Sequence, residues 1–346
     1  AVSSFILIAM ERKADALEGA FKYLILSGLA TAMMLAANAL IFMQMGSLNF
    51  TDVGAFLQGV SLPSSTGIPV VQIALALYVC AFCVKAGVAP FHGWLPGAYS
   101  AAPDSVSVLL AGVVTKISGV FVIIRLMSGL FANLSAPSAA FMALGAFSIV
   151  VGAFAAIGQR DMKRMLAYSS ISQVGYIILA AGLGSPLALA GAMLHFFNHA
   201  VFKSQLFVNA AAVREQTGTT DMENMGGLAE KMKITAGTSV VGFLSTAGIP
   251  PLSGFWSKLL IIMALVKGDQ KFYAALALLM SLVTLGYFLI MQRKLFFGKL
   301  REGLEGLKEA RGALKGVAIG LAGITVIVGV LFPVVMVIMN NNGLLK

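Results

Sequence analysis

The chain has 346 residues, of which 59% are hydrophobic and 11% charged, and its mean hydropathy is +0.91. These values exclude a soluble globular domain and are typical of a polytopic membrane protein. A net charge of +10 would suggest nucleic-acid binding in a soluble protein, but here the basic residues gather in alternate loops between apolar runs, so we expect no nucleic-acid partner.

The chain opens on a short apolar fragment, AVSSFILIAM, which runs into the charged stretch ERKADALEGAFK. The fragment is too short to span a bilayer, and its charges follow it, whereas a signal peptide carries them first. We interpret it as the second half of a helix. The helices before it are then either missing from this sequence or supplied by another chain.

Apolar runs near the length that a spanning helix needs then recur along the whole sequence. They cover 20–45, 67–89, 104–130, 136–158, 165–184, 186–212, 234–266, 272–292 and 315–339. We therefore predict an all-α polytopic membrane protein of about nine complete transmembrane helices plus a partial first one. No linker or low-complexity tract divides it, so 1–346 reads as a single membrane domain.

The distribution of basic residues predicts the orientation in the membrane. The loops 46–66 and 184–186 carry almost none, whereas clusters occur at Arg12/Lys13/Lys22, Arg160/Lys163/Arg164, Arg214/Lys231/Lys233 and from Arg293 to Lys315. The positive-inside rule places the clustered loops in the cytoplasm. We expect a multi-pass protein of the cytoplasmic membrane whose C-terminus is outside.

Two of the apolar runs are interrupted by glycine and proline. VKAGVAPFHGWLPG contains Pro90 and Pro96, and STAGIPPLSGFWSK contains Pro250 and Pro251. Unwound backbone at membrane depth is tolerated only inside protein or beside a water-filled cavity, and paired broken helices indicate an ion or substrate path. Two proline-kinked helices without a path are the alternative.

A few titratable side chains lie inside apolar runs, where a charge is costly and usually functional. They are Lys85, Lys116, Lys203 and Lys258, together with His195 and His199. The two histidines and Lys203 are spaced by four and share one helix face. Burial disfavours the charged forms of lysine and histidine, so such a row can exchange protons without a large energy step.

Three of these residues also have a simpler interpretation. Lys203 could snorkel to the cytoplasmic surface. The histidines could be a hydrogen-bonded pair rather than a proton relay, and they lack the third ligand that a metal site usually has, so we predict no metal.

The acidic residues form the complementary pattern. All 14 fall in loops or at helix ends, including Asp104 after Pro103, so the buried lysines have no obvious carboxylate partner within a span. We expect a partner carboxylate from upstream residues or from another subunit.

No residue is assigned catalytic or cofactor chemistry. Cys80 and Cys83 lie in an apolar run without further ligands and are interpreted as packing residues. No flavin, iron–sulfur or quinone motif is visible, so we expect no cofactor on this chain. The stretch 297–316 is either an amphipathic helix, on the cytoplasmic membrane surface or against a partner subunit, or a solvated loop.

Four long motifs resemble, in this order, the antiporter-like subunits shared by respiratory complex I, membrane-bound hydrogenases and multisubunit Na⁺/H⁺ antiporters. They are KAGVAPFHGWLPGAYSAAPDSVSVLLAGVVTKISGVFVIIRL, QRDMKRMLAYSSISQVGYIILAAGL, LHFFNHAVFKSQLFVNAAAV followed by MGGLAEKM, and STAGIPPLSGFWSKLLI. The resemblance implies fourteen helices with two inverted five-helix repeats, each with one broken helix. It divides this chain into the remainder of the first repeat (1–130), the second repeat (131–297), an amphipathic cytoplasmic connection (298–314) and the last helix with its tail (315–346).

The resemblance also implies roles for the buried residues. Lys85 would pair with a glutamate that the family carries two or three residues before the equivalent of Ala1, and Lys116 would be the central proton-accepting lysine of the first half-channel. His195 and His199 would lie on the polar axis, and Lys258 would be the exit-side site. The histidine-rich helix and Lys258 argue against the complex I member that has glutamate at that position. We favour a hydrogenase-type or complex I-type subunit over a stand-alone antiporter.

From these observations we predict a membrane subunit that translocates H⁺ and is powered by redox chemistry elsewhere in its complex. Whether to class it as an enzyme stays open, because it carries no redox chemistry itself. Its expected partners are the lipid bilayer, other membrane-arm subunits including antiporter-like ones, and iron–sulfur redox subunits. The alternatives are a subunit of a secondary Na⁺/H⁺ antiporter and a non-conducting scaffold.

Overall fold

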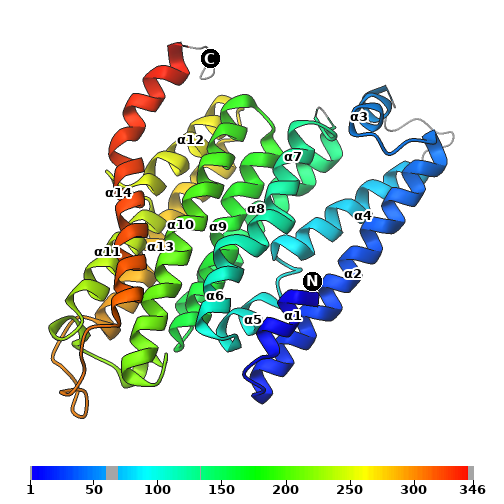
Figure 1. Cartoon of the computed structure of the whole chain (residues 1–346). Helices are drawn as coiled ribbons and strands as arrows, with labels where there is room; N and C mark the ends of the chain where they lie inside the picture. Colours follow the sequence, from blue (N-terminus) through cyan, green and yellow to red (C-terminus); the bar gives the residue numbers. More distant parts are fainter. Residues whose placement is uncertain (1, 60–68, 133, 342–346) are drawn as a thin grey trace.

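The computed structural model describes residues 2–59, 69–132 and 134–341, which form helices joined mostly by short loops (Figure 1). In chain order these are α1 (Val2–Ala9), α2 (Ala14–Met45), α3 (Phe50–Gly59), α4 (Pro69–Ala86), α5 (Leu95–Ala101), α6 (Asp104–Leu109), the π-helical segments η1 (Leu110–Val114) and η2 (Lys116–Phe121), α7 (Val122–Ser128), α8 (Ser135–Ile157), α9 (Met162–Leu183), α10 (Pro186–Thr217), α11 (Lys233–Ala247), α12 (Ser253–Lys267), α13 (Lys271–Leu295) and α14 (Gly312–Asn341). Two single 3-10 turns, Met222–Asn224 and Leu228–Glu230, lie between α10 and α11.

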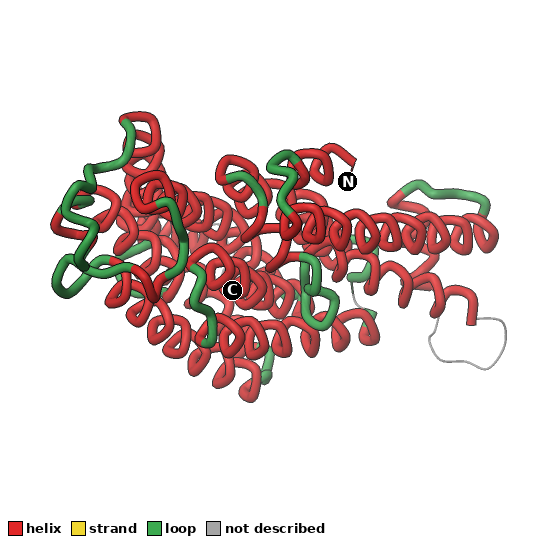
Figure 2. The backbone as a smooth tube through the Cα atoms, turned by 90° about the horizontal axis from the view of Figure 1, so that it is seen from below, coloured by secondary structure: helices red, strands yellow, loops and turns green. Residues whose placement is uncertain are grey.

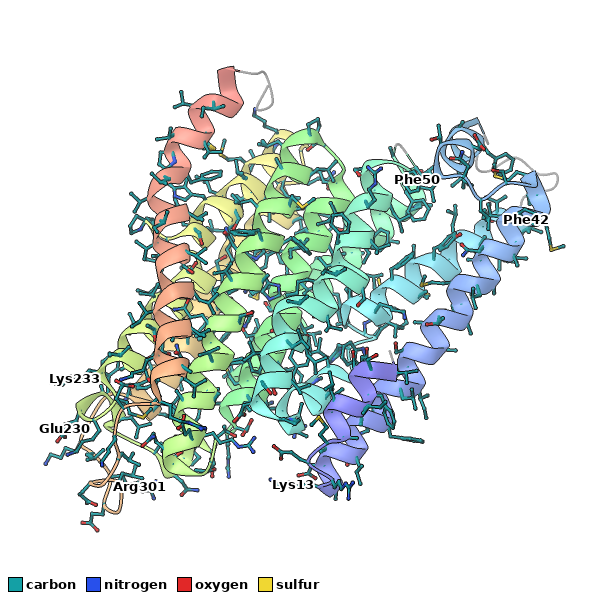
Figure 3. All side chains as sticks on the ribbon, viewed as in Figure 1. Lys13, Phe42, Phe50, Glu230, Lys233 and Arg301 are labelled. Atoms are coloured by element: carbon teal, nitrogen blue, oxygen red, sulfur yellow. The ribbon has the colours of Figure 1, made fainter. Side chains whose placement is uncertain are left out.

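The loops gather at the two ends of this helical bundle. Figure 3 shows Lys13 and Arg301 at one end, which we call the charged end, and Phe42 and Phe50 at the other. Figure 2, viewed from the charged end, shows no strand in the described part of the chain. The prediction of an all-α membrane protein is confirmed.

Six helical stretches of the described chain are long and apolar enough to cross a membrane: α2, the continuous helix from α6 to α7, α8, α9, α13 and α14. The long helix α10 carries His195, His199 and Lys203 and is not among them. The pairs α4/α5 and α11/α12 are the two broken helices. The predicted span 67–89 begins outside the described residues, and the predicted segment 315–346, the last helix with its tail, ends outside them.

Two predictions about the charged end need correction. Lys163 was expected in a loop, but α9 begins at Met162 and buries the Lys163 side chain to 1% exposure. The stretch 297–316 is a loop as far as Arg311, and helix α14 begins only at Gly312, so the predicted surface helix is wrong and the loop alternative holds.

The first broken helix separates α4 from α5 at residues 87–94. Gly87 takes a left-handed φ of +69°, which favours glycine, and the peptide before Pro90 is cis. The freed backbone is paired inside the protein: Trp94 Nε1 donates to the Val84 carbonyl at 2.9 Å, and Ser148 Oγ accepts from the amide of Ala89 at 2.9 Å. Pro96 was predicted as part of the break but lies within α5.

The second broken helix separates α11 from α12 at residues 248–252, where Pro250 and Pro251 lie as predicted. Their shared peptide bond is cis. Gly254, the second residue of α12, lies so close to α11 that an added Cβ would be 1.8 Å from the Ser245 carbonyl oxygen. Only glycine permits this approach, which holds the two half-helices together.

A tryptophan beside the second break bonds a backbone carbonyl of α14 that a proline in α14 leaves unpaired. Pro333 lies inside α14 and has no N–H, so the carbonyl four residues earlier, at Gly329, loses its helical partner. Trp256 Nε1 donates to that oxygen at 2.7 Å. Gly329 also packs directly on the break, because a Cβ there would lie 2.3 Å from the Pro251 oxygen.

We expect Trp256→Phe to destabilise the protein by about 1–3 kcal/mol, the cost of a buried carbonyl left unpaired. In a Pro333→Ala background the same change should cost less, because residue 333 then supplies an N–H to the Gly329 carbonyl. Thermal midpoints of the four detergent-solubilised variants measure both costs. Equal costs in the two backgrounds would contradict this account of α14.

Candidate functional site

Lys116 lies where the helix from α6 to α7 is wound as a π-helix. Its side chain is 1% exposed, and its ammonium donates to the Ala111 carbonyl five residues earlier. The Thr115 hydroxyl donates to the Leu110 carbonyl at 2.9 Å, as does the hydroxyl of Tyr99. π-Helical turns occur often at functional sites, and this one turns backbone oxygens toward the buried lysine.

Two glycines bring the Lys116 segment close to the neighbouring helices. A Cβ on Gly112 would lie 2.1 Å from Ser204 Oγ of α10, and one on Gly119 would lie 2.4 Å from the Ala86 nitrogen at the end of α4. Lys116 is therefore held between the first broken helix and α10.

Lys85 is in the last turn of α4 before the first break and is partly exposed. Its ammonium donates to Thr31 Oγ1 of α2 at 3.0 Å and to Ser27 Oγ at 3.5 Å. It makes no ion pair with a carboxylate among the described residues. A cavity of about 10 Å³, about enough for one water, lies between Lys85 and Thr115.

The histidines of α10 form a buried, stacked pair. Both are 0% exposed, and their ring centroids lie 6.3 Å apart with the planes 4° from parallel. His195 Nδ1 is 2.8 Å from Ser257 Oγ of α12, and Asn198 Nδ2 donates to the same oxygen at 3.2 Å. His199 has no protein hydrogen-bond partner at either ring nitrogen among the described residues. Its ring is thus free to bond water.

Lys203 does not snorkel, and that alternative is wrong. It is 0% exposed in the middle of α10, where its ammonium donates to Ser169 Oγ of α9 at 2.7 Å and to the Leu166 carbonyl at 3.2 Å. The ammonium also lies 5.5 Å from the centroid of the Phe288 ring.

Lys258 lies five residues into α12, directly after the second break. It is 3% exposed, its ammonium lies 4.5 Å from the Tyr176 ring centroid, and it is 3.4 Å from the Ala247 carbonyl. The Tyr176 ring centroid is in turn 6.0 Å from that of His195. Lys258 therefore meets the histidine pair through Tyr176 and Ser257.

The predicted residues are brought together, with Lys85 set apart at one end. His199 lies within electrostatic reach of Lys116, Lys203 and Lys258. The row runs from Lys116 through the α10 histidines to Lys258, with Lys203 beside it. The described residues contain no group of three or more His, Cys, Asp or Glu able to hold a metal. Four basic groups in one buried row, without a carboxylate, can share and pass protons.

A separate ion-pair cluster joins four segments near the charged end. Buried Lys163 pairs with Asp104 at 3.1 Å and donates to the Ala102 carbonyl at 2.7 Å. Arg214 of α10 bridges Asp104 at 3.2 Å and Glu11 at 3.0 Å. Burial alone would raise the pKa of Glu11, but hydrogen bonds and charge from Lys13 and Arg214 outweigh it and lower the pKa. The attraction therefore persists at neutral pH and is lost only as pH falls through that lowered value.

A cavity of about 590 Å³ opens beside this cluster at the charged end. It reaches from Glu11 and Arg214 to His92 and Gly93 of the first break and to Tyr168 of α9. Solvent at the charged end therefore has access to the unwound segment that precedes Lys116.

Sequence reasoning missed several side chains of the site. Ser169, Tyr176 and Ser257 contact Lys203, Lys258 and His195, but hydroxyl residues in an apolar helix carry no obvious signal. The spacing of Ser169, Gln173 and Tyr176, which shows one polar face on α9, could have identified two of them.

Comparisons with known proteins agree on one family. Residues 1–293 match the family model described as NADH:quinone oxidoreductase/Mrp antiporter, transmembrane. The N subunit of the NADH-quinone oxidoreductase of Desulforudis audaxviator is 37% identical over 78% of this chain and 53% of its own length. The D subunit of the Na⁺/H⁺ antiporter of Alkalihalophilus pseudofirmus is 31% identical over 95% of this chain and 66% of its own length.

A solved structure gives the same result. A chain of the membrane-bound sulfane sulfur reductase, an archaeal respiratory membrane complex, superposes with a TM-score of 0.84 and 35% identity, covering 95% of this chain and 54% of that one. This chain thus spans between half and two thirds of the length of the relatives named here.

Proposed function

This chain belongs to the NADH:quinone oxidoreductase/Mrp antiporter membrane family, as its sequence motifs predicted, and from that premise we propose that it is a proton-translocating subunit of a redox-driven membrane complex. One observation carries the proposal: Lys116, His199, His195 and Lys258 are each at most 3% exposed and form one row across α10 and its neighbours. Buried basic groups at bilayer depth persist where they have a task.

In this proposal the charged end faces the cytoplasm, and protons reach Lys116 through the cavity beside the first break. A change of charge near Lys85, caused by a neighbouring subunit, alters the cost of protonating Lys116. The proton then passes along His199 and His195 to Lys258, which releases it on the opposite side. Iron–sulfur subunits of the complex would perform the electron transfer, and we assign no cofactor to this chain.

A secondary Na⁺/H⁺ antiporter is the second candidate. Of the two curated relatives named above, the one that covers the larger share of this chain is an antiporter subunit. The composition of the row favours H⁺. Amine and imidazole nitrogens carry protons, whereas hard cations prefer oxygen ligands, and no carboxylate pairs with the row among the described residues.

The deciding experiment compares wild type with Lys116→Ala in the reconstituted complex, following redox turnover and H⁺ uptake into vesicles with and without sodium. We expect the variant to lose uptake by at least about tenfold and to turn over more slowly, because its central proton acceptor is gone. Lys271→Ala is the matched control, since that lysine is 80% exposed, pairs with exposed Asp269 and does not line the entry cavity.

Two other outcomes would change the conclusion. Wild-type uptake that requires sodium would favour the antiporter. Unchanged uptake in Lys116→Ala, with normal assembly, would leave a non-conducting scaffold.

A further inference from the structure

Helices α9 and α13 carry a second set of buried polar side chains that the histidine row does not use. On α9 these are Ser169, Gln173 and Tyr176, spaced by four and three so that they share one face. On α13 they are Ser281, Thr284 and Tyr287, spaced by three. We call these six residues the hydroxyl ladder. All except Ser281, which is partly buried, are at most 2% exposed.

The two helices run in opposite directions, so the ladder pairs in register. Ser169 Oγ lies 2.8 Å from the Tyr287 hydroxyl, and the Tyr176 hydroxyl lies 3.1 Å from Ser281 Oγ. Seven residues separate the two α9 members of these pairs, which is about 10 Å of helix. Between the pairs, Thr284 and Gln173 both face the Tyr287 hydroxyl.

Each end of the ladder meets a buried lysine. At one end, the Lys203 ammonium donates to Ser169 Oγ at 2.7 Å. At the other end, the Lys258 ammonium lies over the Tyr176 ring, 4.5 Å from its centroid, while the Tyr176 hydroxyl donates to the Ala277 carbonyl at 2.8 Å. The ladder therefore runs from Lys203, which lies beside the histidine row, toward Lys258, where that row also ends, by a route that contains no histidine.

The middle of the ladder is suited to water. Neither polar atom of the Gln173 amide makes a protein hydrogen bond of ordinary geometry in the described structure, although the side chain is 0% exposed. A buried amide whose polar atoms lack well-formed protein hydrogen bonds is suited to binding water. Water bound at Gln173 would connect the Tyr287 pair to the Tyr176 pair.

Resting on the proposed function, we propose that the hydroxyl ladder is a second proton connection to Lys258, which starts at Lys203 and runs parallel to the histidine row. Lys203 gives a proton to Ser169 Oγ while Ser169 passes its own to Tyr287, and each later hydroxyl or water repeats the exchange. A water between the Tyr176 hydroxyl and the Lys258 nitrogen makes the last transfer, because no direct hydrogen bond joins them among the described residues, and the excess proton ends on Lys258. No bond other than O–H and N–H forms or breaks, and every hydroxyl regains a proton.

The test removes each route separately and then both together. One variant, His195→Leu/His199→Leu, keeps only the ladder; a second, Tyr287→Phe/Ser281→Ala, keeps only the histidines; a third combines all four changes. Redox turnover, H⁺ uptake per turnover and the amount of assembled complex are measured for each in reconstituted vesicles. Tyr273→Phe is the matched control. It makes the same substitution as Tyr287→Phe on the same helix, but Tyr273 packs on Phe272 and away from the ladder.

We expect both two-residue variants to retain proton uptake and the combined variant to lose at least about tenfold, because one route substitutes for the other. The proposal of a second route is overturned if His195→Leu/His199→Leu takes up no protons. It is also overturned if the combined variant takes up as many protons as His195→Leu/His199→Leu does. A merely structural bond between α9 and α13 would lower the amount of assembled complex but not the protons moved per turnover. Wild-type vesicles without uptake would instead overturn the proposed function, and the ladder with it.

Discussion

Lys258→Met should abolish redox-coupled proton uptake while leaving the protein folded. Lys258 is where the histidine row and the hydroxyl ladder both end, so no parallel route can bypass its loss. Methionine has a similar length and no charge, and it removes a buried ammonium whose contacts are the Tyr176 ring and one carbonyl. We expect uptake to fall by at least about a hundredfold, with little loss of stability.

Two further variants make this prediction specific. Lys258→Glu should recover part of the uptake, because a carboxyl group also gains and loses a proton at that position. Lys271→Met should behave as wild type, since Lys271 is 80% exposed and pairs only with exposed Asp269. Uptake in Lys258→Met equal to that of Lys271→Met would exclude Lys258 from the proton path.

Asp104→Ala should destabilise the protein by about 3–5 kcal/mol, because it leaves a buried charge without its partner. Lys163 is 1% exposed and would keep only the Ala102 carbonyl as an acceptor. Arg214 would also lose one of its two carboxylates. The thermal midpoint of the detergent-solubilised complex measures the loss.

The matched control is Asp269→Ala, which breaks an exposed pair and should cost at most about 1 kcal/mol. Adding Lys163→Met to Asp104→Ala should restore much of the stability, because the unpaired charge is then gone. Failure of this second change to restore any stability would mean that Asp104 acts through Arg214 instead.

Some features of the site could be predicted from sequence because charge in an apolar run is too costly to be accidental. Lys116, Lys203 and Lys258 were identified this way, and the spacing of His195 and His199 placed them on one face. Glycine and proline likewise marked both breaks, since few other residues permit unwound backbone there. The prediction failed at Lys163, whose neighbours Arg160 and Arg164 made the whole cluster look like a loop.

Neutral polar residues explain most of what sequence reasoning missed. Serine and threonine cost little in a membrane helix, because their hydroxyls can bond a carbonyl of the same helix, as Thr284 does with Met280, and tyrosine is mostly an apolar ring. Their presence therefore predicts nothing about function until a second helix faces them. Ser169 and Tyr287 lie 118 positions apart, and only packing shows that their oxygens meet.

The sequence by itself determined that this chain is a membrane protein, where its two broken helices lie and that Lys116, Lys203 and Lys258 are buried, because each of these follows from the cost of placing a residue in lipid. Tertiary structure alone decided which groups those charges meet. The partner of Lys163 is Asp104, that of Lys203 is Ser169, and that of Lys258 is Tyr176. Such pairings depend on how helices distant in sequence are placed against one another, and no local pattern of residues encodes that placement.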